Sequence, residues 1–150
     1  MESVTVFGEN LFPDRQPWDV VFDTLKVSHS EFWVLAEGGD HGDLESAIPQ
    51  EGVVSAHGTA VGVPTRASRT RIGIALSVWG ETPPDGRGVY LGTCRVDAPA
   101  RELTCVNVEG REPGPALVLP DAGEYGVKAW RCASEEPERY DIRVWPCPDR

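Results

Sequence analysis

One segment near the middle of the chain, Arg71–Trp79, constrains the fold more than any other. Its sequence, RIGIALSVW, puts large apolar side chains at every second position: Ile72, Ile74, Leu76 and Val78. The positions between them hold Gly73, Ala75, Ser77 and Trp79. Successive side chains of a strand point to opposite faces of a sheet, whereas a helix would distribute these residues around its axis. The segment is therefore predicted to be a half-buried β-strand.

Comparable segments recur along the chain, separated by turns rich in Gly and Pro. The predicted strands are Ser3–Phe7, Lys26–Glu37, Gly52–Val63, Arg71–Trp79, Val89–Val96, Arg101–Val108, Glu124–Cys132 and Arg139–Trp145. Such short strands at a spacing of roughly ten residues are typical of β-sandwiches and barrels. We expect an all-β fold, an antiparallel β-sandwich of about eight short strands, with a partly closed barrel as the alternative.

Two of the connections predict hairpins. Val89–Val96 and Arg101–Val108 would pair around Asp97–Ala100, and the last two predicted strands would pair across Ser134–Glu138. The polar, Pro-rich stretch Glu81–Gly88 (ETPPDGRG) is instead predicted to be a loop. With 150 residues and 40% hydrophobic residues, the chain is expected to form a single domain, residues 1–150, with its own core.

The charge of the chain limits what it can bind. The formal net charge is -10 and the pI is about 4.7, so direct binding to a phosphate backbone, which needs basic patches, is not expected. A basic protein partner would be attracted to such a chain. The acidity also serves solubility, with or without a partner.

The sequence predicts a cytoplasmic protein with reduced thiols. Met1 is followed by Glu2, no basic and apolar leader follows, and no stretch approaches the ~18 apolar residues of a membrane helix. The cysteines are Cys94, Cys105, Cys132 and Cys147, and none of their spacings forms a C-x-x-C zinc motif. A disulfide between Cys94 and Cys105 stays open, because a hairpin could place the two thiols opposite each other.

No motif for catalysis or cofactor binding is present. The histidines His29, His41 and His57 lie outside any recognised catalytic pattern, and there is no phosphate-binding glycine loop. We therefore expect no enzyme activity and no cofactor. Asp40, His41 and Asp43 form the one dense group of ligand-type residues, and they are weak candidates for holding a cation because Asp and Gly also build ordinary turns.

The last two predicted strands indicate a candidate binding surface. Alternation puts Lys128 and Trp130 on one face of the first strand, and Arg143 and Trp145 on the same face of the second. Trp79 would join them if its strand lies in the same sheet. Aromatic and basic side chains on an outer face are typical of contact surfaces, although Lys and Arg side chains also cover Trp rings on ordinary sheets.

Several segments occur in a familiar order along the chain: Leu25–Leu35 (LKVSHSEFWVL), Gly52–Gly62, Arg71–Trp79, Leu117–Tyr125 (LVLPDAGEY), Lys128–Trp130 and Tyr140–Ile142. Through these segments the chain resembles the competence-protein J (ComJ-like) family of inhibitors of a DNA-entry nuclease. The resemblance implies a β-sandwich that binds a secreted or membrane-bound nuclease and blocks it. The insert Glu81–Gly88 and the longer N-terminal part, residues 1–24, depart from the family pattern.

The favoured prediction is thus a non-catalytic binding protein of the nuclease-inhibitor or immunity type, with a basic nuclease or toxin as its partner. The alternative is a β-sandwich that binds a carbohydrate or another small ligand through the outer Trp face. The oligomeric state is left open by the sequence.

Overall fold

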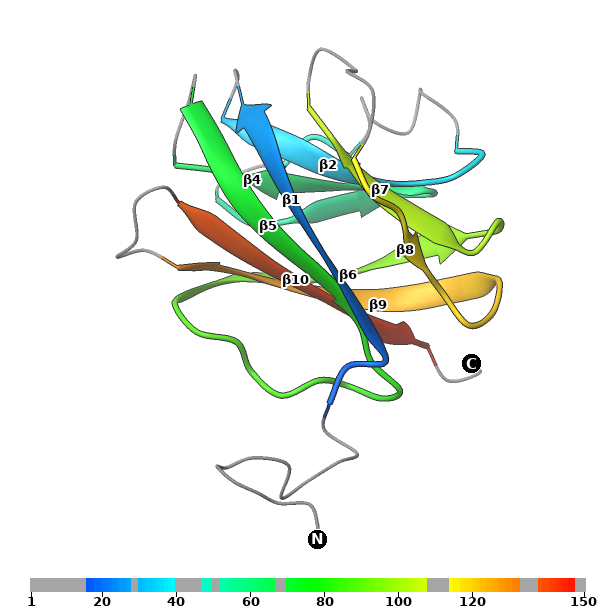
Figure 1. Cartoon of the computed structure of the whole chain (residues 1–150). Coiled ribbons are helices and arrows are strands. Elements are labelled where there is room, and N and C mark those ends of the chain that lie inside the picture. Colours follow the sequence, from blue (N-terminus) through cyan, green and yellow to red (C-terminus); the bar gives the residue numbers. More distant parts are fainter. Residues whose placement is uncertain are drawn as a thin grey trace, which may run out of the picture.

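The structure is a computed structural model that describes residues 16–27, 30–39, 47–49, 52–66, 70–107, 114–132 and 138–147. These ranges contain ten strands and no helix (Figure 1). The strands are β1 (Asp19–Val27), β2 (Glu31–Ala36), β3 (Ser55–His57), β4 (Ala60–Pro64), β5 (Thr70–Val78), β6 (Val89–Ala98), β7 (Glu102–Val106), β8 (Leu117–Val118), β9 (Gly123–Cys132) and β10 (Arg139–Pro146). No helix in the described ranges could therefore cross a bilayer.

The strands form two five-stranded sheets packed face to face. The first sheet has the order β1-β5-β10-β9-β6, and the second has the order β3-β4-β2-β7-β8. The predicted β-sandwich is confirmed, and the barrel alternative is wrong because neither sheet closes. Neighbouring strands are antiparallel except β5 and β10, which run parallel in the middle of the first sheet.

The core lies between the two sheets and follows from the alternation of side chains along each strand. On β5 the four large apolar residues predicted to share a face are all buried, and Tyr140, Ile142 and Val144 continue the same layer on β10. From the second sheet, Phe32 meets Tyr140 edge-on, with ring centroids 5.6 Å apart. Burial of these side chains supplies the main stabilising free energy of the fold, at about 1.5–3 kcal/mol for each large residue.

The buried tyrosine keeps its hydroxyl group hydrogen-bonded. Tyr140 Oη donates to Glu138 Oε1 at 2.6 Å and accepts the backbone N–H of Arg66 at 3.2 Å. Burial and the bond to Glu138 raise the pKa of Tyr140 well above its usual value. The paired hydroxyl lets a polar aromatic side chain sit in the core without an unsatisfied donor.

The predicted hairpin between Val89–Val96 and Arg101–Val108 is wrong. β6 belongs to the first sheet and β7 to the second, so residues 99–101 carry the chain from one layer to the other. Arg101 adopts a left-handed conformation with φ 67°, and its N–H donates to the carbonyl of Ala98. Two alternating strands joined by a short turn look alike in sequence whether they pair or change sheet.

Two further predictions about strands met different outcomes. The segment Gly52–Val63 is not one strand but the short hairpin β3–β4, which turns at Gly58, a glycine with φ 56°. The hairpin of β9 and β10 is confirmed, with Ile142 opposite Ala129. The predicted strand Ser3–Phe7 lies outside the described residues.

Candidate functional site

The outer face of the first sheet carries the residues singled out in the sequence. Neighbouring positions on this face follow from the strand register: Phe22 lies beside Ala75, Ala75 beside Asp141, and Asp141 beside Trp130. Trp79 follows β5 directly, and its N–H donates to the carbonyl of Val144 on β10, so it joins the same sheet. The face divides into two parts: a capped half around Trp79, Trp130 and Arg143, and an open groove over Gly73 and Ala75.

The capped half is built around one guanidinium group between two indoles. The guanidinium carbon of Arg143 lies 5.1 Å from the ring centroid of Trp79 and 5.3 Å from that of Trp130. Trp79 Nε1 donates to Ser77 Oγ at 2.9 Å, so its polar atom is also satisfied. A cation over the face of an indole is attracted to it, most strongly where water is excluded.

Arg143 is also held by hydrogen bonds at its edge. Its Nε lies 3.2 Å from both carboxylate oxygens of Asp141, and Nη2 lies 2.8 Å from Oδ2. The remaining nitrogen, Nη1, donates to the carbonyl oxygen of Pro84 at 2.8 Å. The arginine therefore joins β10 to the loop between β5 and β6.

That loop, residues 80–88, covers Trp130 and holds Arg143 in place. It is drawn in green in Figure 1 and passes outside the first sheet, with Pro83 buried against it. At Gly86 a Cβ atom would lie 2.8 Å from Cδ2 of Trp130, so only glycine allows this close approach. Trp130 is 3% exposed beneath this loop, and Trp79, which stacks on the other side of Arg143, is 7% exposed.

Trp145 and Lys128 lie at the border of the capped half. Lys128 Nζ is 5.9 Å from the Trp145 ring centroid, and Gly126 makes room for the indole. A hollow of about 360 Å³ lies between this indole and the start of the loop, lined by Gly80, Glu81, Thr82, Trp145, Pro146 and Cys147. The structure thus brings the five predicted binding residues together, and Trp145 is the most accessible of the three indoles. A binding role for the five residues stays a prediction.

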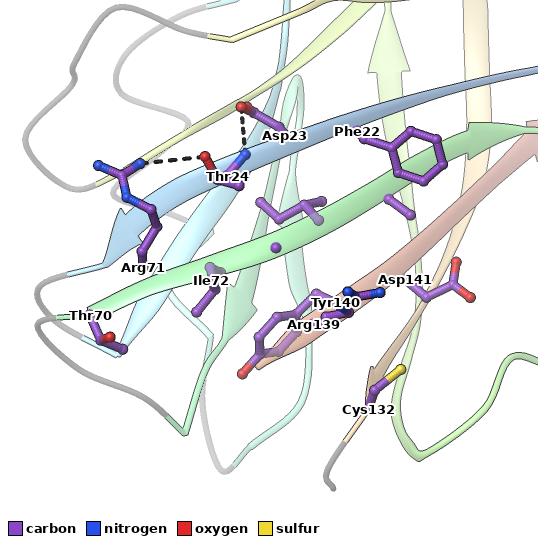
Figure 2. A pocket seen from close by; sticks show the side chains of 13 residues that line it. Phe22, Asp23, Thr24, Thr70, Arg71, Ile72, Cys132, Arg139, Tyr140 and Asp141 are labelled. Carbon is purple, nitrogen blue, oxygen red and sulfur yellow. Dashed lines mark hydrogen bonds between the residues drawn. The ribbon is translucent and has the colours of Figure 1, made fainter. Parts of the chain in front are cut away.

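The open groove occupies the other half of the same face. It is a mainly apolar depression of about 600 Å³ over β1, β5 and β10, and its floor is formed by Gly73 and Ala75. Figure 2 shows the ring of Phe22 towards one end of the groove and Thr70 and Arg71 towards the other. Phe22 is 73% exposed, which makes it the most exposed large apolar side chain among the described residues.

Polar groups lie on both sides of β1 next to the groove: Thr24 shares the outer face with Phe22, whereas the carboxylate of Asp23 lies on the opposite side of the strand, close to Gly114. Arg71 Nη1 donates to Thr24 Oγ1 at 3.4 Å, and the N–H of Thr24 donates to Asp23 Oδ1 at 2.8 Å (Figure 2). Partial burial raises the pKa of Asp23, against the lowering effects of the Thr24 hydrogen bond and of Arg71. The other carboxylate oxygen, Oδ2, is buried and has no hydrogen-bond partner.

The other candidate residues from the sequence form no site in the described ranges. Asp40, His41 and Asp43 lie outside the described residues, and within the described ranges no three His, Cys, Asp or Glu side chains form a metal-binding group. Cys94 and Cys105 are both free thiols on different sheets. Burial raises the pKa of Cys94 to about 12 and that of Cys105 further still.

The groove was not anticipated from the sequence, although its signal was present. Gly73 and Ala75 are the smallest residues on the outer face of β5, and the register puts Phe22 next to them. Recognising the depression requires knowing that β1 and β10 flank β5, and that order comes only from the topology.

Taken together, the fold and this face define a two-sheet β-sandwich with one outer surface partly sealed by its own loop. Searches by sequence match no protein-family model and no curated protein. By structure, the chain is similar to ComJ from Bacillus subtilis, described as an inhibitor of the DNA-degrading activity of NucA. The TM-score is 0.61 at 12% identity, over 88% of this chain and 98% of that one. A second similar structure is the product of crocagin biosynthetic gene J, with a TM-score of 0.60 at 13% identity, over 85% of this chain and 97% of that one. At these identities the likeness shows a shared fold.

Proposed function

We propose that this chain is a non-catalytic binding protein that inhibits a nuclease or nuclease toxin by occupying its basic surface. The observation that carries the proposal is the structural likeness to ComJ, an inhibitor of NucA, which extends over nearly the whole of both chains. The resemblance in segment order, from Leu25–Leu35 to Tyr140–Ile142, points to the same family of inhibitors.

The charge of the chain supports a basic partner. Half of the 24 acidic residues but ten of the 14 basic residues lie in the described ranges. Most of the excess negative charge therefore belongs to the other segments of the sequence. Negative charge on those segments would accelerate the encounter with a basic partner, because complementary charge acts mainly on the association rate.

The accessible surface of the tryptophans gives little support to the alternative function, binding of a carbohydrate or another small ligand through the outer Trp face. Trp79 and Trp130 are buried and both stack on Arg143, and Gly86 of the loop packs against Trp130, so the two indoles offer almost no surface to a sugar ring or a lipid. Trp145 alone keeps part of its surface.

The proposal is tested by measuring DNA degradation by a basic nuclease encoded beside the gene for this chain. We expect inhibition that saturates at a fixed molar ratio, with an association rate that falls as salt rises from 50 to 500 mM. Heat-unfolded protein of the same net charge is the control for nonspecific polyanion effects. Unchanged nuclease activity, together with a pull-down from native cells that recovers no nuclease, would overturn the proposal.

A further inference from the structure

Two cations lie side by side at the end of the open groove that is farthest from Phe22. Lys26 on β1 and Arg71 on β5 are direct partners in the strand register, and both alternate with core residues, so they share the outer face. Like charges directly opposite each other destabilise a sheet. In the part of the chain that the structure describes, neither residue forms an ion pair with an acidic side chain. An anion on this face would relieve the repulsion between them.

The acidic groups nearest to the groove do not supply this anion. Asp141 lines the groove, but its carboxylate is held by Nε and Nη2 of Arg143. The carboxylate of Asp23 lies on the opposite side of β1. Arg71 makes only a long hydrogen bond, 3.4 Å from Nη1 to Thr24 Oγ1 (Figure 2). Within the described ranges, most of the five guanidinium donors are therefore available to a ligand.

Next to these cations, the groove offers an apolar bed. Gly73 and Ala75 form its floor, and a Cβ atom at Gly73 would lie 3.6 Å from Cγ of Arg139, whose aliphatic part borders the hollow. Phe22 and Lys26 are four residues apart on β1, which corresponds to about 13 Å along the strand. The volume of about 600 Å³ is in the range of small-ligand sites. The combination suits a short apolar chain that ends in an anionic group.

We propose that the open groove binds one molecule of an amphiphilic carboxylate, such as a medium-chain fatty acid. The carboxylate lies beside Lys26 and Arg71, since a guanidinium group binds a carboxylate through paired N–H donors. The alkyl chain lies over the floor of the groove and ends against Phe22. The ligand is the free monomer, because a hollow accepts a single chain and the net charge of -10 is repelled by an anionic membrane surface. This inference does not rest on the proposed nuclease inhibition.

The test is isothermal titration calorimetry of the full chain with decanoate, below its micelle concentration and at neutral pH. We expect saturable binding of one molecule per chain, and shifts of the Gly73 and Ala75 amide signals in NMR spectra. Acetate keeps the carboxylate without the chain, and decyl maltoside keeps the chain without the charge. Both should bind at least about fivefold more weakly than decanoate. Equal binding of either compound, or a dissociation constant for decanoate above about 1 mM, would overturn the proposal.

Variants of the full chain locate the site. Arg71→Gln should raise the dissociation constant for decanoate about three- to fivefold, the range of an exposed ion pair. Ala75→Glu should raise it at least about tenfold, because the new carboxylate occupies the floor and repels the ligand. Both residues lie on the outer face, and circular dichroism checks that each variant is folded. Arg95→Gln, at an exposed cation of β6 on the same face, is the matched control and should leave the dissociation constant unchanged.

Three results with these variants and with membranes would contradict the proposal. Unchanged affinity in both Arg71→Gln and Ala75→Glu would show that decanoate binds elsewhere. An equal loss in Arg95→Gln and Arg71→Gln would assign the effect to the net charge of the chain. Binding to vesicles of anionic phospholipid without binding to decanoate would make this face a membrane contact instead of a site for a single molecule.

Discussion

The two halves of one sheet face show how the same strands can produce a sealed surface and an accessible one. In the capped half, β9 and the end of β5 contribute indoles, and the loop 80–88 with Arg143 covers them. In the open groove, β5 contributes only the small residues Gly73 and Ala75. Because no large side chain fills the space above them, a depression remains on the surface. The comparison teaches that large aromatic residues on an outer face need not mark a contact surface. Here the small residues mark the accessible part.

The largest expected effect comes from removing the arginine that seals the capped half. Arg143→Ala should lower the free energy of unfolding by about 2–4 kcal/mol, because Asp141 loses its partner and both indoles lose their cover. Urea denaturation monitored by tryptophan fluorescence measures it. The matched control is Arg95→Ala, whose ion pair with Glu124 at 3.5 Å is solvent-exposed and should be worth less than about 0.5 kcal/mol. Equal losses in the two variants would show that the stacked arginine does not seal this half.

A pair of glycine substitutions tests whether the two halves differ in packing. Gly86→Ala should destabilise the protein by about 1–2 kcal/mol, since its Cβ would lie 2.8 Å from the Trp130 indole. Gly73→Ala in the groove floor should be neutral or stabilising by up to about 1 kcal/mol, because the nearest atom to its Cβ, Arg139 Cγ, is 3.6 Å away. The midpoints of thermal unfolding measure both. The reverse order of the two midpoints would contradict the assignment of sealed and open halves.

The smallest expected effect concerns Asp23 on β1, whose carboxylate lies on the side of the strand opposite the open groove. A raised pKa means that the protonated carboxyl fits the folded state better, so this stability is present below about pH 4 and is lost as the pH rises through the folded pKa. Asp23→Asn keeps the oxygen that accepts the Thr24 N–H and removes the charge. The variant should be slightly more stable than the wild type at pH 7, by less than about 0.5 kcal/mol, and equal to it at pH 3. Urea titrations at the two pH values compare them, and a less stable variant at pH 7 would show that the charge itself is favourable.

The elements that could be predicted from the sequence are those determined by local alternation. β5 and the β9–β10 hairpin follow from apolar side chains at every second position, together with a turn between paired segments. The change of sheet between β6 and β7 could not be predicted, because a short polar connection permits either a hairpin or a corner. The parallel pairing of β5 with β10 joins segments about seventy residues apart, and no local pattern encodes it.

The candidate site was predictable only in part, for a similar reason. Alternation correctly put Trp130, Trp145, Lys128 and Arg143 on one face. Their burial depends on the carbonyl of Pro84 and the missing side chain of Gly86, which come from a loop with no periodic pattern. The groove likewise depends on which strands flank Gly73 and Ala75.

The position of β10 has a consequence for how the protein is made. This strand lies at the centre of the first sheet, between β5 and β9, although it is the last of the described strands to be synthesised. While the ribosome is still translating the residues before Arg139, β5 lacks the neighbour that connects it to β9 and β6. The first sheet can therefore become complete only when residues 139–146 have left the exit tunnel. During translation its two unfinished parts, β1–β5 and β9–β6, are the surfaces that chaperones would need to shield.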